Sequence, residues 1–222
     1  MLVLTSAKIR RSLQKKMNET YTDVTFSFHE SMKEAEPELP DAEILITYGD
    51  DLTETIVEKA KKLKWVMVIS AGVENLPFET LKEKQILVTN ARGIHKIPMA
   101  EYAIAMLIAT VKNMKQWHKN ERNHYWGDKS AAHMGEISGK TMAVLGAGAI
   151  GEEIARLAKA FNMKTLGLNR SGHKVDFFDE TFSNEQINEC VAEADFVVAI
   201  LPHTNETEKM ISRKQFQAMK DD

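Results

Sequence analysis

The chain has 222 residues, of which 43% are hydrophobic and 27% are charged, and its formal net charge is −3. This is the profile of an ordinary globular protein, long enough for one large domain or two modest ones. Acidic and basic residues are mixed along the chain, which excludes the basic stripe of a nucleic-acid surface. No apolar run approaches the roughly 20 residues of a membrane span, and the order of the first residues is wrong for a signal peptide. The single cysteine, Cys190, allows no intrachain disulfide and favours a reducing cytoplasm.

Short apolar runs alternate with helical segments through the first ninety residues. These runs are nearly continuous and rich in Val and Ile, as strands buried on both faces are. They are Leu2–Thr5, Val24–Phe28, Ile44–Tyr48, Trp65–Ile69 and Ile86–Thr89. The clearest helix between them is Thr53–Leu63, with Thr53 as its N-cap. The alternation predicts a parallel sheet covered by helices, a small flavodoxin-like domain.

A long helix is expected next, from about Met99 to His118, because apolar residues recur there at helical spacing. Its first half, Ala103–Ala109, is apolar on every side. Such a helix is buried all round, either in the core of its own subunit or against a second subunit, and the sequence leaves both interpretations open. Residues 119–139 are polar and show no clear periodicity.

A second α/β block begins at Lys140, and it carries the strongest motif in the chain. The apolar strand 141–145 runs into Gly146-Ala147-Gly148-Ala149-Ile150-Gly151, which has the form G-x-G-x-x-G. An amphipathic helix follows, and its apolar face is Ile150, Ile154, Leu157, Ala158 and Phe161. This context predicts a Rossmann-type dinucleotide site. There Gly146 permits the tight turn, Gly148 lets the backbone approach a pyrophosphate, and Gly151 allows close packing of helix and strand.

The residues that end the next strand, Lys164–Leu168, bear on the choice of cofactor. An Asp or Glu at this point would bind the ribose 2′-hydroxyl of NAD, but the chain has Asn169-Arg170-Ser171. Arg170 can pair with a 2′-phosphate and Ser171 can add a hydroxyl donor. We therefore expect NADP to be preferred, with NAD as the alternative. The competing interpretation makes Arg170 a solvated arginine that stacks on the adenine.

Four motifs together resemble the D-isomer-specific 2-hydroxyacid dehydrogenases. Besides the glycine turn they are Ser70-Ala71-Gly72-Val73-Glu74-Asn75, Met99-Ala100-Glu101-Tyr102 and Leu201-Pro202-His203-Thr204-Asn205-Glu206-Thr207. The resemblance implies a substrate domain (residues 1–98), a partial dinucleotide-binding domain (residues 99–222) and a homodimer. It also implies roles for individual residues. The amides of Ala71, Gly72 and Val73 would bind a substrate carboxylate. Ala149 and Ile150 would contact the cofactor, Leu201 and Pro202 would wall its adenosine pocket, and Thr207 would hydrogen-bond near it.

The resemblance further implies an oxidoreductase that reduces a small 2-oxoacid to a D-2-hydroxyacid. Its catalytic arginine, glutamate and histidine are expected after Asp222, so this chain alone is expected to be inactive. Arg92 and His203 lie in the wrong motifs for these roles. The apolar strand expected at Asp195–Leu201 would be an unprotected sheet edge, which predicts that the natural protein continues. His118, His124 and His133 lack metal-ligand spacing, so we expect no metal.

Two other functions remain open from the sequence. A non-catalytic NAD(P)-binding sensor or corepressor on the same fold would use the nucleotide to drive dimerisation and partner recruitment. A different Rossmann enzyme, of the formate or phosphoglycerate type, would share the glycine turn but differ in substrate. Arg, Glu and His in the following segment would favour the dehydrogenase, and their absence would favour the sensor.

Overall fold

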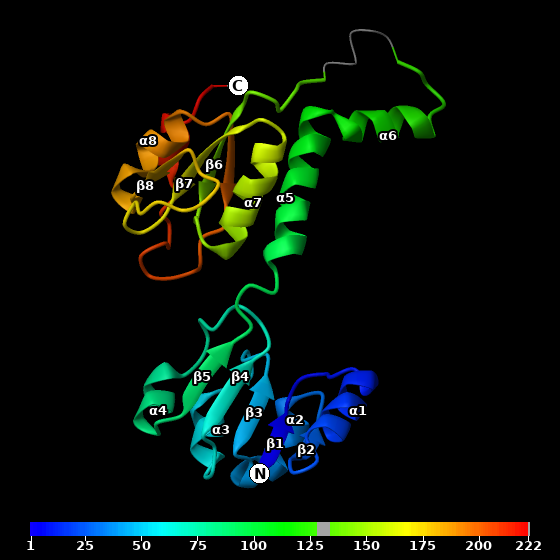
Figure 1. Ribbon diagram of the computed structural model, residues 1–222, viewed down its shortest axis with the longest axis vertical. Coiled ribbons are helices and arrows are strands. Elements are labelled where there is room, and N and C mark those ends of the chain that lie inside the picture. Colours follow the sequence, from blue (N-terminus) through cyan, green and yellow to red (C-terminus); the bar gives the residue numbers. More distant parts are fainter. Residues whose placement is uncertain (128–133, 222) are drawn as a thin grey trace. The chain divides into compact units, whose positions relative to one another are not determined.

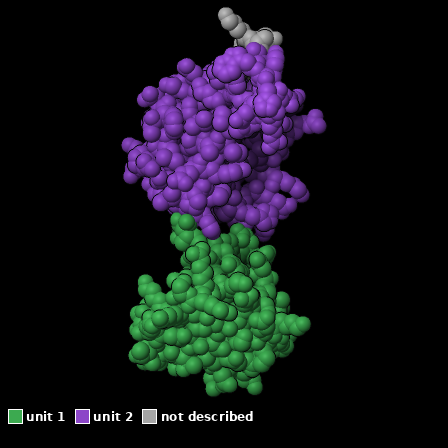
Figure 2. Space-filling model, turned by 90° about the vertical axis from the view of Figure 1, so that its right-hand side faces the viewer, with its two compact units in different colours: residues 1–94 green, residues 95–222 purple. Residues whose placement is uncertain are grey.

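The structure is a computed structural model that describes residues 1–127 and 134–221. The chain forms two compact units, residues 1–94 and residues 95–222, which we call the first and second units (Figure 2). The domain boundary expected after residue 98 falls inside helix α5 (Lys96–Val111), which belongs to the second unit.

The first unit is a five-stranded parallel sheet in the order β2-β1-β3-β4-β5 (Figure 1). Its strands are β1 (Leu2–Thr5), β2 (Thr25–Phe28), β3 (Ile44–Thr47), β4 (Trp65–Val68) and β5 (Leu87–Asn90). Its helical segments are α1 (Arg11–Thr20), α2 (Met32–Ala35), η1 (Glu36–Asp41), α3 (Glu54–Lys59) and α4 (Phe78–Glu83). Every expected strand is present within a residue or two, and the strand order confirms the flavodoxin-like fold.

Helix α3 begins as predicted and ends early. The side chain of Thr53 accepts a hydrogen bond from the amide of Ile56, which satisfies one of the unpaired donors at the helix start. The predicted end at Leu63 is wrong, because Ala60 already leaves the helical conformation (ψ 84°). Both Ala60 and Leu63 are buried in the core of the first unit, so tertiary packing overrides the local helical pattern.

The second unit contains a four-stranded parallel sheet in the order β8-β7-β6-β9. Its strands are β6 (Thr141–Leu145), β7 (Lys164–Leu168), β8 (Glu180–Phe182) and β9 (Phe196–Ala199). Its other helical segments are α6 (Met114–Arg122), α7 (Ala149–Ala160), η2 (Asn184–Gln186), α8 (Ile187–Ala192) and α9 (Arg213–Ala218). The order matches strands 3-2-1-4 of the Rossmann arrangement, so this part of the fold prediction is confirmed.

The single long helix expected from Met99 to His118 is wrong, because two helices occupy this region (Figure 1). Helix α5 ends at Val111 and α6 starts at Met114. Between them Asn113 adopts the left-handed conformation (φ 50°), which asparagine tolerates better than most residues. The chain therefore turns at Asn113, and periodicity alone gave no sign of it.

Helix α5 buries only one of its faces within this chain. It packs against α7 through Ala100 and Ile104, which are buried. On its other side Tyr102 is 61% exposed and Met106 is 46% exposed. The interpretation of α5 as a helix buried all round in its own subunit is therefore wrong for residues 1–127 and 134–221, which leave Tyr102 and Met106 exposed.

Two side chains near the sheet of the second unit differ in burial. Cys190 is fully buried in an apolar cluster, where it packs as a small hydrophobe, and burial raises the pKa of its thiol to about 12. Phe161 was expected on the apolar face of α7, but it is 39% exposed. It lies one residue beyond the helix end, where the helical spacing no longer sets its direction.

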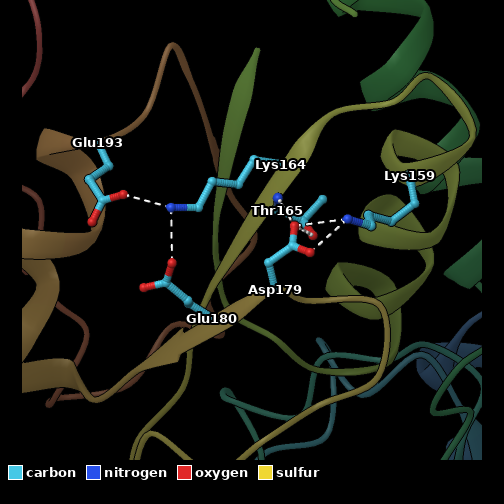
Figure 3. Close-up of polar contacts among 6 residues, drawn as sticks. All are labelled: Lys159, Lys164, Thr165, Asp179, Glu180 and Glu193. Carbon is cyan, nitrogen blue, oxygen red and sulfur yellow. Dashed lines mark hydrogen bonds and ion pairs between the residues drawn. The ribbon is translucent and has the colours of Figure 1, made fainter. Parts of the chain in front are cut away.

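Ion pairs tie together the start of β7 and its neighbours (Figure 3). Lys164 donates to Glu193 at 2.8 Å and pairs with Glu180 at 2.9 Å, and these carboxylates raise the pKa of Lys164. Lys159 donates to both oxygens of Asp179 at 2.7 and 2.9 Å, and the amide of Thr165 donates to the same carboxylate. These charges are all paired at the amino-terminal edge of the sheet, opposite the glycine turn, and their role is structural.

Asp195 joins the starts of β6 and β9, and we expect Asp195→Asn to destabilise the protein by about 1 kcal/mol at neutral pH. The amide of Thr141 donates to its carboxylate at 2.7 Å and Lys220 donates at 2.9 Å; both lower the pKa of Asp195. A lowered pKa in the folded state stabilises the fold above the ordinary carboxyl pKa, and this stabilisation is lost as the pH falls through the folded value. Urea unfolding at several pH values measures the effect.

The difference between the parent chain and Asp195→Asn should therefore shrink below about pH 4. Asp176→Asn is the matched control, because Asp176 is exposed and forms no ion pair or side-chain hydrogen bond within the described residues. A difference that stays constant from neutral pH to pH 3 would contradict the assigned role of the carboxylate.

Candidate functional site

The glycine turn joins β6 to α7, and two of its glycines are required by its geometry. Gly146 has φ +113°, and a Cβ there would lie 2.7 Å from the carbonyl oxygen of Ile200. A Cβ on Gly151 would collide with the carbonyl oxygen of Gly146 and would lie 3.1 Å from Val144 Cγ1. A side chain at either position would therefore push the turn away from the sheet.

Gly148 differs from these two, because an added Cβ would meet nothing within 4 Å. It is the N-cap of α7, and no side chain caps the first amides of this helix of 12 residues. Backbone N–H groups without an acceptor and the positive end of the helix dipole both favour an anion. The open side of the turn thus has the form and the charge of a phosphate site.

One acidic side chain of this helix, Glu153, is directed away from the glycine turn. Glu153 is buried, and Arg156 donates to its Oε1 from Nη2 at 2.7 Å and from Nε at 3.0 Å. Lys96 lies 3.5 Å from the other oxygen. Hydrogen bonding from Arg156, supported by Lys96, lowers the pKa of Glu153. Its negative charge is therefore neutralised within the second unit and does not oppose an anion at the turn.

The segment after β7 forms an ordered turn. The amide of Ser171 donates to Asn169 Oδ1 at 3.2 Å, and the side-chain amide of Asn169 donates to the carbonyl of His173 at 2.8 Å. The hydroxyl of Ser171 lies 3.1 Å from His173 Nδ1. Arg170 is exposed and donates to Glu206 at 2.6 Å. The side chain of Asn169 holds the turn. Nothing in the sequence indicated that His173 would contact Asn169 and Ser171, or that Glu206 would pair with Arg170.

The loop that follows β9 borders an open pocket of about 270 Å³ whose lining includes Leu201, Pro202, His203 and Thr207. The hydroxyl of Thr207 lies within the loop and accepts a hydrogen bond from the amide of Thr204 at 2.9 Å. Leu201 packs against the core below. The structure thus brings the three residues expected near the adenosine into one pocket, and Thr207 also holds the shape of the loop.

In the first unit, the expected carboxylate-binding loop follows β4. Asn90 donates to the carbonyl of Ala71 at 2.6 Å, and Ser70 donates to the carbonyl of Gly72 at 3.1 Å. Within the described residues, the amides of Ala71, Gly72 and Val73 donate no hydrogen bond. Successive amides without acceptors form an anion-binding nest. Asn90, which the sequence analysis did not single out, holds one end of this loop.

A pocket of about 260 Å³ lies beside this loop, and Tyr48 and Gly72 are in its lining. Its charged lining residues are Asp50 and Glu74, both exposed. Arg92 is exposed and follows Asn90 by two residues.

The described residues offer neither a metal-binding cluster nor a membrane-spanning helix. Among residues 1–127 and 134–221, no cluster of three or more His, Cys, Asp or Glu side chains is arranged to hold a metal ion. His118 pairs with Glu121 at 3.5 Å, His124 is exposed, and His133 lies outside the described residues. None of the described helices is both long and apolar enough to cross a membrane.

A parallel sheet whose first strand enters a G-x-G-x-x-G turn, followed by an uncapped helix, defines a Rossmann-type dinucleotide-binding domain. The chain belongs to the D-isomer specific 2-hydroxyacid dehydrogenase family, since residues 104–222 match the model of that family's NAD binding domain. This confirms the resemblance that the motifs indicated.

Several known proteins are similar to this chain over most of its length. D-3-phosphoglycerate dehydrogenase of Methanocaldococcus jannaschii is 32% identical over 190 residues, which are 82% of this chain and 35% of that protein. An acyclic imino acid reductase in complex with NADPH and D-Arg is 26% identical, with a TM-score of 0.85 over 99% of this chain and 71% of that one. D-Lactate dehydrogenase from Aquifex aeolicus, complexed with NAD and lactic acid, is also 26% identical, with a TM-score of 0.82 over 100% of this chain and 66% of that one. The chain thus spans about a third of the length of the first of these relatives.

Proposed function

We propose that this protein is an oxidoreductase that uses NADPH, in preference to NADH, to reduce a small 2-oxoacid to the D-2-hydroxyacid. The observation that carries the proposal is a pair of anion sites built from unpaired backbone amides. One is the start of α7 in the second unit, and the other is the loop Ala71–Val73 in the first. A dinucleotide presents a pyrophosphate and a 2-oxoacid presents a carboxylate, so the two sites fit the two reactants.

In this proposal residues 1–98 form the substrate domain and residues 99–222 the dinucleotide-binding domain. The amides of Gly148, Ala149 and Ile150 bind the pyrophosphate, and Leu201 and Pro202 flank the adenosine. Arg170 and Ser171 receive the 2′-phosphate, which explains the preference for NADPH. The bound nicotinamide supplies the hydride. Ala71, Gly72 and Val73 orient the substrate by holding its carboxylate.

The protonation of the substrate oxygen needs a general acid, and we assign that role to no residue of this chain. His203 lies in the loop that lines the adenosine-side pocket, and Arg92 precedes the dinucleotide domain. We propose that the catalytic arginine, glutamate and histidine lie outside these 222 residues. We also propose a homodimer that forms through the exposed apolar side of α5, around Tyr102 and Met106. A cytoplasmic location is a further part of the proposal, and cell fractionation would test it.

Titration of the purified chain with NADPH and NADH, followed by nicotinamide fluorescence, tests the cofactor site. We expect NADPH to bind more tightly than NADH by on the order of tenfold, since one charge-assisted hydrogen bond contributes that much. Arg170→Met should remove this preference, and Arg213→Met, at an exposed arginine on α9, should not. Glyoxylate or pyruvate added to the NADPH complex should give no turnover. The molecular mass measured by light scattering should be twice 25.1 kDa, the mass of one chain.

Each readout can fail separately. Failure to bind either dinucleotide would refute the dinucleotide site, and equal affinities would refute the preference for NADPH. Oxidation of NADPH by a 2-oxoacid on this chain would show that the catalytic groups lie within it. A monomer mass would remove the homodimer from the proposal.

A further inference from the structure

A single ion pair joins the two loops that border the proposed adenosine site. Arg170 follows β7, Glu206 lies in the loop after β9, and β6 with its glycine turn separates these two strands in the sheet. Arg170 Nη2 donates to Glu206 Oε2 at 2.6 Å, although the residues are 36 positions apart. The contact therefore connects the two sides of the dinucleotide turn.

Glu206 occupies a donor that a 2′-phosphate would need. Within the described residues, the bond to Glu206 is the one hydrogen bond that the side chain of Arg170 donates. A phosphate oxygen that binds the same N–H must either displace the carboxylate of Glu206 or lie close to its negative charge. Both alternatives weaken phosphate binding, because like charges near one guanidinium repel each other.

We propose that Glu206 is a cofactor-specificity residue, whose carboxylate competes with the 2′-phosphate of NADP(H) for Arg170. The inference deepens the proposed function and depends on its dinucleotide site. NADH has no 2′-phosphate, so Glu206 does not compete with it. The chain then discriminates less strongly in favour of NADPH than Arg170 alone would allow.

The ion pair is exposed enough for a ligand to replace Glu206 as the partner of Arg170. The side chain of Arg170 is 79% exposed and that of Glu206 is 61% exposed, and ion pairs this exposed are weak. The loop does not depend on the pair for its shape, because the amide of Thr204 donates to the hydroxyl of Thr207 and the amide of Glu208 donates to the carbonyl of Thr204. Substitution of Glu206 should therefore leave the loop folded.

The test is the affinity of the purified chain for NADPH and NADH, measured by calorimetry and nicotinamide fluorescence. Glu206→Gln should tighten NADPH binding by about threefold to tenfold, the effect of removing one exposed competing charge, and should leave NADH binding unchanged. The gain should shrink in high salt, which screens charges this exposed. Glu208→Gln is the matched control, since Glu208 lies two residues along the same loop and pairs with Lys209 instead.

The double variant Arg170→Met, Glu206→Gln separates competition at Arg170 from a general charge effect. On the Arg170→Met background, Glu206→Gln should have no effect on NADPH binding. An equal gain there, or in Glu208→Gln, would overturn the inference, and so would unchanged or weaker NADPH binding by Glu206→Gln. If Arg170→Met weakens NADPH binding and Glu206→Gln has no effect, only the role of Glu206 fails. If Arg170→Met itself leaves NADPH binding unchanged, both the role of Glu206 and the proposed preference for NADPH fail.

Discussion

Gly148→Val is expected to abolish dinucleotide binding and to leave the free energy of unfolding nearly unchanged. Gly148 has an extended backbone (φ −91°, ψ −164°), which valine adopts readily, and an added Cβ meets nothing within 4 Å. The branched side chain would fill the open space before the first amides of α7, where the pyrophosphate is proposed to bind. With two or more charge-assisted hydrogen bonds lost, the affinity should fall on the order of a hundredfold or more.

NADPH titration and urea unfolding of the same preparation measure the two effects. Gly148→Ala adds only a methyl group and should reduce the affinity less than valine does. Normal NADPH binding by Gly148→Val would place the pyrophosphate away from this turn. A large loss of stability would mean that other atoms occupy the space beside Gly148 in solution.

Gly151→Ala, by contrast, should destabilise the protein by about 1–3 kcal/mol, because overpacking at a backbone contact has no easy relief. The added methyl would collide with the carbonyl oxygen of Gly146, and Val144 lies close behind it. A backbone atom cannot rotate away as a side chain can, so α7 must move off β6. Urea unfolding should show a lower midpoint with an unchanged slope.

Gly148→Ala is again the control, since it makes the same substitution three residues earlier in open space. If Gly151→Ala and Gly148→Ala unfold at the same urea concentration, α7 does not pack on β6 as closely as described. Loss of NADPH binding by Gly151→Ala with unchanged stability would also contradict this explanation, because it would give Gly151 a direct role at the ligand.

Both proposed anion sites lie at the carboxyl ends of parallel strands. The glycine turn follows β6, the carboxylate loop follows β4, and Arg170 follows β7. The paired lysines and carboxylates of Figure 3 lie at the opposite, amino-terminal edge of the second sheet. Ligands of open α/β sheets bind at the carboxyl edge, where both proposed anion sites have unpaired amides. The paired charges at the opposite edge therefore have no part in ligand binding in this proposal.

Much of the fold could be predicted because its signals are local. Apolar runs rich in Val and Ile located every expected strand, and Thr53 marked the start of α3. The glycine spacing located the turn between β6 and α7, because a positive φ and a close backbone contact each require glycine. The apolar runs, the N-cap at Thr53 and the contact of Gly151 with Gly146 depend on neighbours within a few residues of one another, which a sequence displays directly.

Only the tertiary structure decided the rest. The one-sided burial of α5 depends on which elements pack against that helix. The hydrogen bond from Asn90 to Ala71 spans 19 residues, and the pair of Arg170 with Glu206 spans 36. No periodicity records such contacts, since they arise when the ends of different strands meet at one edge of a sheet. The sequence by itself determined that a dinucleotide turn exists, and the packing of the sheet decided which side chains surround it.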